Sequence, residues 1–180
     1  MNVELHTPRL LLRPLTEADL PDLFILDSNP EVHRYLSQRP ISSMQEAEAY
    51  LAYILSQYAE YGIGRLAIIE KASGEFVGWS GLKYETEVRT EFDYYDLGYR
   101  LKQNFWGQGI ATEAARESLR FGFEDLQLTK ICAGADVNNK ASNYILGQKL
   151  GMRAGGPFTY DGILCHWYEL TLEDWQNRNH

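Results

Sequence analysis

The sequence is poor in cysteine, with only Cys132 and Cys165 among its 180 residues. Two cysteines cannot form a disulfide framework, and their spacing matches no zinc-binding pattern. We therefore expect two buried thiols in a reducing compartment, and no metal site.

Long apolar runs are also lacking. None approaches the roughly 20 residues that a membrane-spanning helix needs, and no basic stretch followed by an apolar one marks a signal peptide at the N-terminus. The net charge of −8 argues against a protein that holds nucleic acid by its phosphates. We expect a soluble, cytosolic protein that binds neither membranes nor nucleic acid, with monomer and dimer both open.

The composition, 44% apolar and 23% charged, is that of an ordinary globular chain. A chain of this length buries roughly 70% of its unfolded surface, enough for a hydrophobic core. No repeat, linker or low-complexity tract divides it. The prediction is one domain over residues 1–180.

The first part of the chain is punctuated by capping boxes. Residues 10–15 predict a short buried strand. Residues 16–19 and 43–46 each place a hydroxyl three positions before a carboxylate, which favours two helix starts. The second helix should end at Gly62 or Gly64, because glycine adopts the left-handed conformation of a helix C-cap at little energetic cost.

Strands then alternate with helices. The patterns predict helices at 110–126 and 141–150, and strands at 66–69, 76–79, 92–101, 130–137, 158–160 and 163–172. The last two strands flank Asp161 and Gly162, a strong hairpin turn. This order favours an α/β (α+β) domain with a mixed central sheet of six to seven strands and helices on both faces.

The most informative segment runs from Tyr99 to Ala111. Here a strand enters a loop with glycines at 107 and 109, and the loop enters a helix. The N–H groups and dipole at a helix N-terminus favour an anion, and glycines allow close approach, so a phosphate or pyrophosphate site is apt. A strand-to-helix turn without a ligand is the alternative. Position 112 is threonine, so the dinucleotide fingerprint fails, and no Gly-Lys-Ser/Thr run is present.

A second polar segment comes after the strand at 130–137. Asn138, Asn139 and Ser142 stand where that strand meets the next helix. Their side chains could bind a peptide-like ligand between parting strands. Helix capping by either asparagine is the commoner use of such residues.

Together these segments resemble the GNAT acetyltransferase superfamily. The resemblance rests on Y-R-L-x-x-x-x-W-G-x-G-I-A-T-E-A at 99–114, N-x-A-S at 139–142 and K-L-G-M at 149–152. Residues 7–15, 97–99 and 166–175 are similar to strands of the ribosomal-protein N-terminal acetyltransferase (RimJ/RimL) type branch. The resemblance spans about residues 7–175.

The resemblance implies a fold in which two central parallel strands splay apart around acetyl-CoA. The pantetheine arm would pair with backbone near Tyr99–Leu101, and the pyrophosphate would sit on N–H groups from Asn104 to Ala111. Asn139 would contact the pantetheine or support the acceptor site, and Ser142 would lie beside the thioester sulfur. The cofactor-binding residues implied are Tyr99, Arg100, Leu101, Asn104, Phe105, Trp106, Gly107, Gln108, Gly109, Ile110, Ala111, Asn139 and Ser142.

Two positions depart from the superfamily pattern. Asn104 stands where glutamine or arginine commonly opens the glycine run. The segment from Ser142 to Gly151 is one residue longer than the branch pattern, and an inserted helical residue rotates every later residue by ~100° unless a bulge absorbs it. The tyrosine that protonates the departing thiolate in many members corresponds here to Leu146, with Tyr144 two residues earlier.

Acetyl transfer to an amine needs a proton acceptor, donors for the carbonyl oxygen and a proton for the thiolate. Asp96 is the candidate base, because the RimJ/RimL-type strand often carries a glutamate there; a plain surface carboxylate is the alternative. Ser142 is the second catalytic candidate, as a proton relay, although serine also caps helices. Glu113 is expected to stabilise the helix start without a catalytic role.

Charge is unevenly distributed along the chain. Residues 85–96 hold five acidic residues and Arg89, a local balance of −4, which suits a cationic acceptor or simply a solvated loop. Around the glycine turn Arg100, Lys102, Arg116 and Arg120 outweigh Glu113 and Glu117, and we expect them to form a positive patch for the anionic cofactor.

The leading hypothesis is an acetyl-CoA-dependent N-acetyltransferase that acts on a primary amine by direct transfer in a ternary complex. The acceptor could be a protein N-terminus or a small cationic amine such as a polyamine or an antibiotic. The alternative is a non-catalytic sensor module that binds acetyl-CoA or CoA with the same fold.

Overall fold

Hydrophobic periodicity organises residues 3–178, the part of the chain that the computed structural model describes, into strands that build one sheet and helices that cover it. The strands are β1 (Leu5–His6), β2 (Leu10–Pro14), β3 (Arg65–Glu70), β4 (Phe76–Glu85), β5 (Tyr94–Leu101), β6 (Lys130–Asp136), β7 (Arg153–Tyr160) and β8 (Ile163–Thr171). The α-helices are α1 (Leu20–Asp27), α2 (Met44–Tyr61), α3 (Ile110–Arg120), α4 (Lys140–Tyr144) and α5 (Leu172–Arg178).

The sheet is mixed, and its strand order is β1-β2-β3-β4-β5-β6-β8-β7. Only β5 and β6 run parallel; every other neighbouring pair is antiparallel. This confirms the α/β fold with a mixed sheet. The expected six to seven strands were too few, because the described chain forms eight. The two-residue β1 is too short to produce a periodic pattern.

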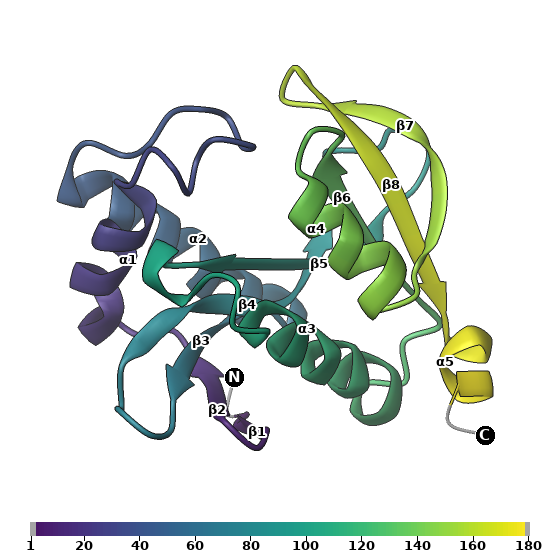
Figure 1. Cartoon of the computed structure of the whole chain (residues 1–180), viewed down its shortest axis with the longest axis horizontal. Helices are drawn as coiled ribbons and strands as arrows, with labels where there is room; N and C mark the ends of the chain where they lie inside the picture. The colour runs from purple at the N-terminus through teal and green to yellow at the C-terminus, as the bar shows by residue number, and fades with distance from the viewer. Residues whose placement is uncertain (1–2, 179–180) are drawn as a thin grey trace.

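Helices cover both faces of the sheet (Figure 1). α1 and α2 pack on one face in a cluster that includes Leu23, Leu51 and Trp79. α3 packs on the other face, where Leu119 meets Leu82 of β4. β6, β7 and β8, with α4 and α5, form the other end of the molecule in the same view.

The capping boxes hold as predicted. Thr16 pairs with Asp19 before α1, and Ser43 pairs with Glu46 before α2. α2 ends at Gly62, whose φ of 65° is left-handed. The closing hairpin turns at Asp161 and Gly162, both with positive φ. α5 was not predicted, because residues 172–178 lack a pattern that separates them from the end of the last strand.

Two helices predicted as continuous instead finish in π-helical turns. α3 continues as η3 (Phe121–Asp125), where Leu126 N donates to Phe121 O at 3.0 Å. α4 continues as η4 (Ile145–Lys149), where Leu150 N donates to Ile145 O at 2.8 Å. A π-turn accommodates one extra residue without rotating the residues after it. The π-turn at Ile145–Lys149 lies within the segment from Ser142 to Gly151, for which the resemblance predicts one extra residue.

Cys132 and Cys165 are both free and buried, as expected. Burial raises the pKa of the Cys132 thiol to about 12, so it stays protonated and unreactive. Among residues 3–178, no helix has both the length and the apolar content to span a bilayer.

Candidate active site

The candidate site begins where β5 and β6 part. The two strands pair at a single position, Asp96 opposite Cys132. Beyond it, β5 continues to Leu101 and β6 to Asp136 without a ladder between them, although β5 stays paired with β4 along its whole length. One edge of β5 over 97–101 therefore has no strand partner. Backbone groups there are free to pair with an extended, amide-containing ligand.

A side-chain hydrogen bond crosses this gap. The Tyr99 hydroxyl of β5 lies 2.8 Å from Ser142 Oγ at the start of α4. Burial raises the pKa of Tyr99 to about 12, and the hydrogen bond with Ser142 only partly offsets it. The phenol therefore keeps its proton at every ordinary assay pH. The structure thus brings together two of the predicted site residues, 43 positions apart in the chain.

The start of α4 fixes Ser142. Asn139 is the N-cap, and its side-chain oxygen accepts from Ser142 N at 3.1 Å. This is the capping role expected as the commoner alternative for Asn139. Tyr144 is 53% exposed, whereas Leu146 is 2% exposed in the core. Leu146, at the position of the superfamily tyrosine, has no hydroxyl and cannot donate a proton.

The glycine turn leads from β5 into α3. Gly107 and Gly109 have φ of 74° and 77°, a left-handed conformation that favours glycine. A Cβ at Gly107 would meet nothing within 4 Å, so the turn borders open space. Phe105 and Ile110 are buried in the core, so only their backbone can face a ligand. Asn104 is exposed, and its carbonyl accepts from Gln108 Nε2 at 3.0 Å.

The rest of the turn is open to solvent on one side. Trp106 is 44% exposed, and its indole N–H donates to Leu101 O at 2.9 Å, which closes the end of β5. Ala111 packs at the edge of the core. The N–H groups of Ile110, Ala111 and Thr112 precede the first intrahelical hydrogen bond of α3, which Glu113 N donates to Gly109 O at 3.1 Å. The turn therefore offers a row of donors at a helix start.

Sequence reasoning missed the residues that hold this turn. Glu113 Oε1 accepts from Thr7 Oγ1 at 2.6 Å and from Arg9 N at 3.0 Å, and Oε2 accepts from Arg9 Nε at 2.6 Å. Arg9 Nη1 donates to Gln108 O at 2.9 Å. Burial raises the pKa of Glu113, but Thr7 and Arg9 outweigh it, so the pKa is lowered overall. Only the proximity of Arg9 in space reveals its place at the turn.

The prediction that Arg100, Lys102, Arg116 and Arg120 form a positive patch at the glycine turn is wrong, because all four side chains bind other partners. The Arg100 guanidinium turns to the α1/α2 face and donates to Asp27 at 2.5 Å. Lys102 pairs with Asp22 at 2.6 Å, and Arg120 pairs with acids on its own helix and the turn after it. Arg116 donates to Lys149 O at 3.1 Å. Arg100 can line the gap only with its backbone.

The face of β4 and β5 toward α1 and α2 carries buried ion pairs. Arg65 of β3 binds both the Asp96 carboxylate and the Asp96 carbonyl, the latter at 2.7 Å. A Cβ at Gly98 would lie 2.6 Å from Arg65 Nη2, so glycine makes room for the guanidinium. Asp96 is therefore not a plain surface carboxylate, because Arg65 holds one of its carboxylate oxygens. Lys83 likewise pairs with Glu85 at 2.5 Å.

These pairs change the meaning of the acidic segment 85–96. Arg89 pairs with Glu91 at 3.3 Å, and Asp96 and Glu85 each have a cationic partner from β3 or β4. Part of the local excess of acid in the sequence is therefore neutralised in the fold. Glu87 and Asp93 remain exposed, without an ion pair among residues 3–178.

The same face holds unpaired polar atoms. Trp79 lies between two guanidinium groups, 5.2 Å from Arg65 and 5.1 Å from Arg100 to the ring centroid. Its indole N–H is buried and lacks a hydrogen-bond partner among the described residues. Buried His33 has its Nε2 3.4 Å from Asp27 Oδ1, without the alignment of a hydrogen bond. Together with Arg100, His33 outweighs burial and lowers the pKa of Asp27.

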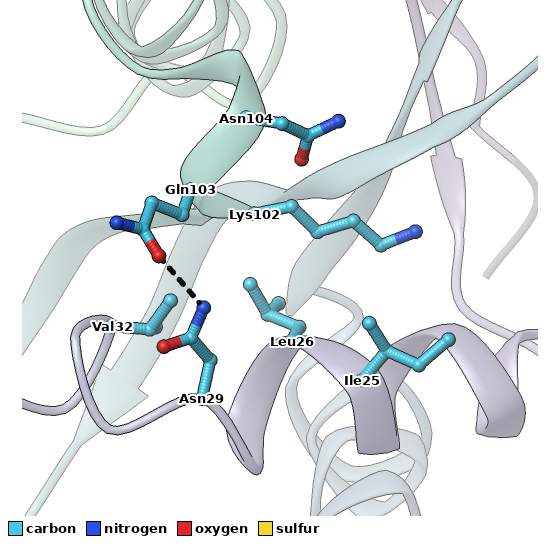
Figure 2. Close-up of a pocket in the computed structure, with 7 residues that line it drawn as sticks. All are labelled: Ile25, Leu26, Asn29, Val32, Lys102, Gln103 and Asn104. Carbon is cyan, nitrogen blue, oxygen red and sulfur yellow. Dashed lines mark hydrogen bonds between the residues drawn. The ribbon is translucent and has the colours of Figure 1, made fainter.

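One open cavity adjoins the site, and a second lies apart from it. The first, about 390 Å³, lies between α1 and η2 (Gln103–Phe105), beside the start of the glycine turn. Figure 2 shows Asn29 donating to Gln103 across it, at 3.1 Å. The second, about 330 Å³, lies between α3, η4 and α5. Within residues 3–178 no three histidine, cysteine, aspartate or glutamate side chains gather as a metal site.

The geometry fits an extended thioester with a pyrophosphate. Comparison with known proteins agrees. The sequence model of the acetyltransferase (GNAT) domain matches residues 9–153, and the chain belongs to this family. It is therefore an acetyl-CoA-dependent acyltransferase.

Named relatives share the family but differ in what they act on. The chain is similar to an FsC-acetyl coenzyme A-N(2)-transacetylase of Aspergillus fumigatus, with 33% identity over 79% of this chain and 62% of that one. It is also similar to the spermidine N(1)-acetyltransferase of Escherichia coli K12, with 28% identity over 86% and 75%.

The fold is shared with a solved structure of RimL, described as a ribosomal L7/L12 alpha-N-protein acetyltransferase in complex with coenzyme A. The TM-score is 0.78, the identity is 17%, and the match covers 96% of this chain and 99% of that one. At this identity the likeness extends to the fold alone.

The glycine turn allows a matched test. Gly109→Val should reduce affinity for CoA at least about tenfold, the loss of one charge-assisted hydrogen bond, because a side chain intrudes where the backbone must meet phosphate. Gly74→Val is the control: Gly74 has φ of 74° and open space around it, but lies in the β3–β4 turn. The measurement is calorimetric titration of both variants. Equal CoA affinity in the two would remove the turn from the site.

Proposed function

We propose that this chain transfers the acetyl group of acetyl-CoA to a primary amine, with the thioester in the gap between β5 and β6. The observation that carries the proposal is the unpaired edge of β5 over 97–101, which leads directly into the glycine turn. Acetyl-CoA, when bound, supplies an activated acyl group. The amine nitrogen would form a bond to the thioester carbon, the carbon–sulfur bond would break, and the amine proton would leave.

Tyr99 and Ser142 are proposed to supply the proton for the leaving thiolate. Their hydroxyls lie 2.8 Å apart across the gap, and Asn139 holds Ser142 at the helix start. Tyr99 keeps its proton because burial raises its pKa to about 12. This pair takes the part that the helix tyrosine has in other members of the superfamily.

Asp96 is proposed as the proton acceptor. One carboxylate oxygen is bound by Arg65, while the other has no hydrogen-bond partner among residues 3–178. A carboxylate is a much weaker base than an amine. A weak base, directly or through water, suffices for an α-amine, which titrates near 7.7–8, but less well for a lysine near 10.4.

The acceptor is proposed to carry a carbonyl or carboxylate oxygen close to its amine, as a peptide N-terminus does. Support comes from the face that Asp96 occupies, where every cation has a carboxylate partner and the Trp79 N–H has no acceptor among the described residues. Buried N–H groups are nearly always paired, so an oxygen of the acceptor would fill this position. A polyamine brings no such oxygen.

This acceptor class agrees with the RimJ/RimL-type branch that the sequence resembles, and assignment to that branch forms part of the proposal. The fully reduced, buried cysteines support a cytosolic setting, where thiols stay reduced.

Tyr99→Phe should lower kcat by about 100-fold, the typical contribution of a general acid, while leaving the KM for acetyl-CoA within about twofold. Tyr95→Phe is the matched control, since Tyr95 lies on the same strand and packs against the same core cluster. Steady-state kinetics with a saturating amine distinguish them. An unchanged kcat in Tyr99→Phe would show that the thiolate takes its proton elsewhere.

Asp96→Asn should lower kcat at least about tenfold with little change in acetyl-CoA affinity, because it removes the proton acceptor but retains an oxygen for Arg65. Asp93→Asn is the control, an exposed carboxylate three residues away on the same segment. Thermal unfolding of both variants separates lost chemistry from a lost ion pair. A wild-type rate in folded Asp96→Asn would leave water as the proton acceptor.

An acceptor panel tests the function itself. With acetyl-CoA, a peptide with a free N-terminus should react with a kcat/KM at least about tenfold above that of spermidine, as expected when one buried donor is satisfied. Trp79→Phe should lower this ratio of kcat/KM values, because it removes the N–H that an oxygen of the acceptor would meet; thermal unfolding of the variant measures the separate cost of the smaller ring in the core. A preference for spermidine would contradict the acceptor class. Binding of acetyl-CoA without turnover of any amine would favour the sensor module.

A further inference from the structure

The turn between β1 and β2 reaches the glycine turn from the far end of the sequence. Lys71 N donates to Arg9 O at 2.9 Å, and Lys71 Nζ donates to Thr7 O at 2.5 Å, which fixes this turn on the sheet. Leu10 N donates to Thr7 Oγ1 at 2.9 Å. The Arg9 guanidinium therefore projects from a rigid base rather than from a loose terminus.

Arg9 makes two kinds of contact at the glycine turn. Its Nη1 donates to Gln108 O, the carbonyl between the two glycines, at 2.9 Å. Its Nε and backbone N–H bind the two oxygens of Glu113 in the first turn of α3. Nη2 has no hydrogen-bond partner among the described residues, and it lies 3.5 Å from where a Cβ at Gly109 would stand.

Arg9 offsets the negative charge of Glu113 at the N-terminus of α3. A carboxylate at the N-terminus of α3 stabilises the helix, but it repels a phosphate brought to the same N–H groups. The cations expected to offset Glu113 are engaged elsewhere: Arg100 with Asp27, Lys102 with Asp22, Arg120 with Glu117, and Arg116 with the Lys149 carbonyl. Arg9 alone, within residues 3–178, forms an ion pair with Glu113.

We propose that Arg9 is a positioning residue for the phosphates of acetyl-CoA: it holds the glycine turn against α3, neutralises Glu113, and presents a free Nη2 beside Gly109. The proposal rests on the proposed function, since it assumes that the turn receives the pyrophosphate. It adds the β1–β2 turn, remote in sequence, to the machinery that binds the cofactor.

The test uses two acetyl donors, acetyl-CoA and S-acetyl-N-acetylcysteamine, a thioester without phosphates. Arg9→Gln should raise the KM for acetyl-CoA about 10- to 100-fold, the scale of one or two charge-assisted hydrogen bonds, with kcat within about twofold. For the phosphate-free donor, kcat/KM should stay within about twofold of the unmodified chain. A structural defect would instead lower activity with both donors alike.

Two further variants separate the effect of the Arg9 charge from that of the guanidinium geometry. Arg9→Lys keeps the charge but loses the fork, and should fall between the unmodified chain and Arg9→Gln. Glu113→Gln placed on Arg9→Gln should recover part of the lost affinity, because the unpaired carboxylate is removed. Arg153→Gln is the control: this arginine of β7 is exposed and pairs with Asp174 of α5, away from the glycine turn.

Three outcomes would overturn the proposal. They are an unchanged KM in Arg9→Gln, an equal loss with both donors, and no recovery in the double variant. If Arg9→Gln does not fold, Arg9→Lys decides the matter by the same comparison of donors. If the unmodified chain itself fails to bind acetyl-CoA, the proposed function falls and this inference with it. If the unmodified chain binds acetyl-CoA and the Arg9 variants have the same KM for acetyl-CoA as the unmodified chain, only the inference about Arg9 is overturned.

Discussion

The structure depends on a single constraint, the divergence of its two parallel strands. β5 and β6 meet at Asp96 and Cys132 and then separate, because β5 stays with β4 while β6 stays with β8. Divergence leaves a strand edge with unpaired backbone groups inside the molecule, which a folded protein rarely tolerates unless a ligand or water pairs with them. The glycine turn begins where this edge ends. The proposed site therefore joins the gap and the turn.

The two sides of the gap differ in character. On the side of α4 a protonated pair, Tyr99 and Ser142, spans the opening. On the side of α1 and α2 the charges are balanced by pairs such as Arg65 with Asp96. Buried pairs of this kind contribute little net stability but hold charged groups in fixed positions. A reaction that ends with a thiolate on one side and begins with an ammonium on the other suits such a division.

Local chemistry made much of the fold predictable. The capping boxes, the left-handed Gly62 and the hairpin at Asp161 and Gly162 arise from rules that act over a few residues. The π-turns after α3 and α4 were not located from the sequence, because one turn of π-helix leaves the pattern of apolar residues nearly unchanged. β1 and α5 were not predicted, because β1 has only two residues and α5 only seven. Elements this short show too little hydrophobic periodicity to be distinguished from the longer strands next to them.

The part of the candidate site that is formed by backbone groups could be predicted from the sequence. The part that depends on ion pairs between residues far apart in the chain could not. The glycines at 107 and 109 predict the turn from the sequence alone. Nothing local connects Arg9 with Glu113, 104 residues later, or Arg65 with Asp96. The positive patch was misassigned for the same reason: a count of charges along the chain ignores which face each side chain takes.

The central claim, that the β5–β6 gap and the glycine turn together hold acetyl-CoA, is tested most directly by amide hydrogen exchange with and without saturating acetyl-CoA. The account predicts slower exchange in peptides covering 97–101 and 104–111, and no change in the β3–β4 turn at 71–74. Unchanged exchange over 97–111, or protection confined to the cavity between α3 and α5, would contradict it.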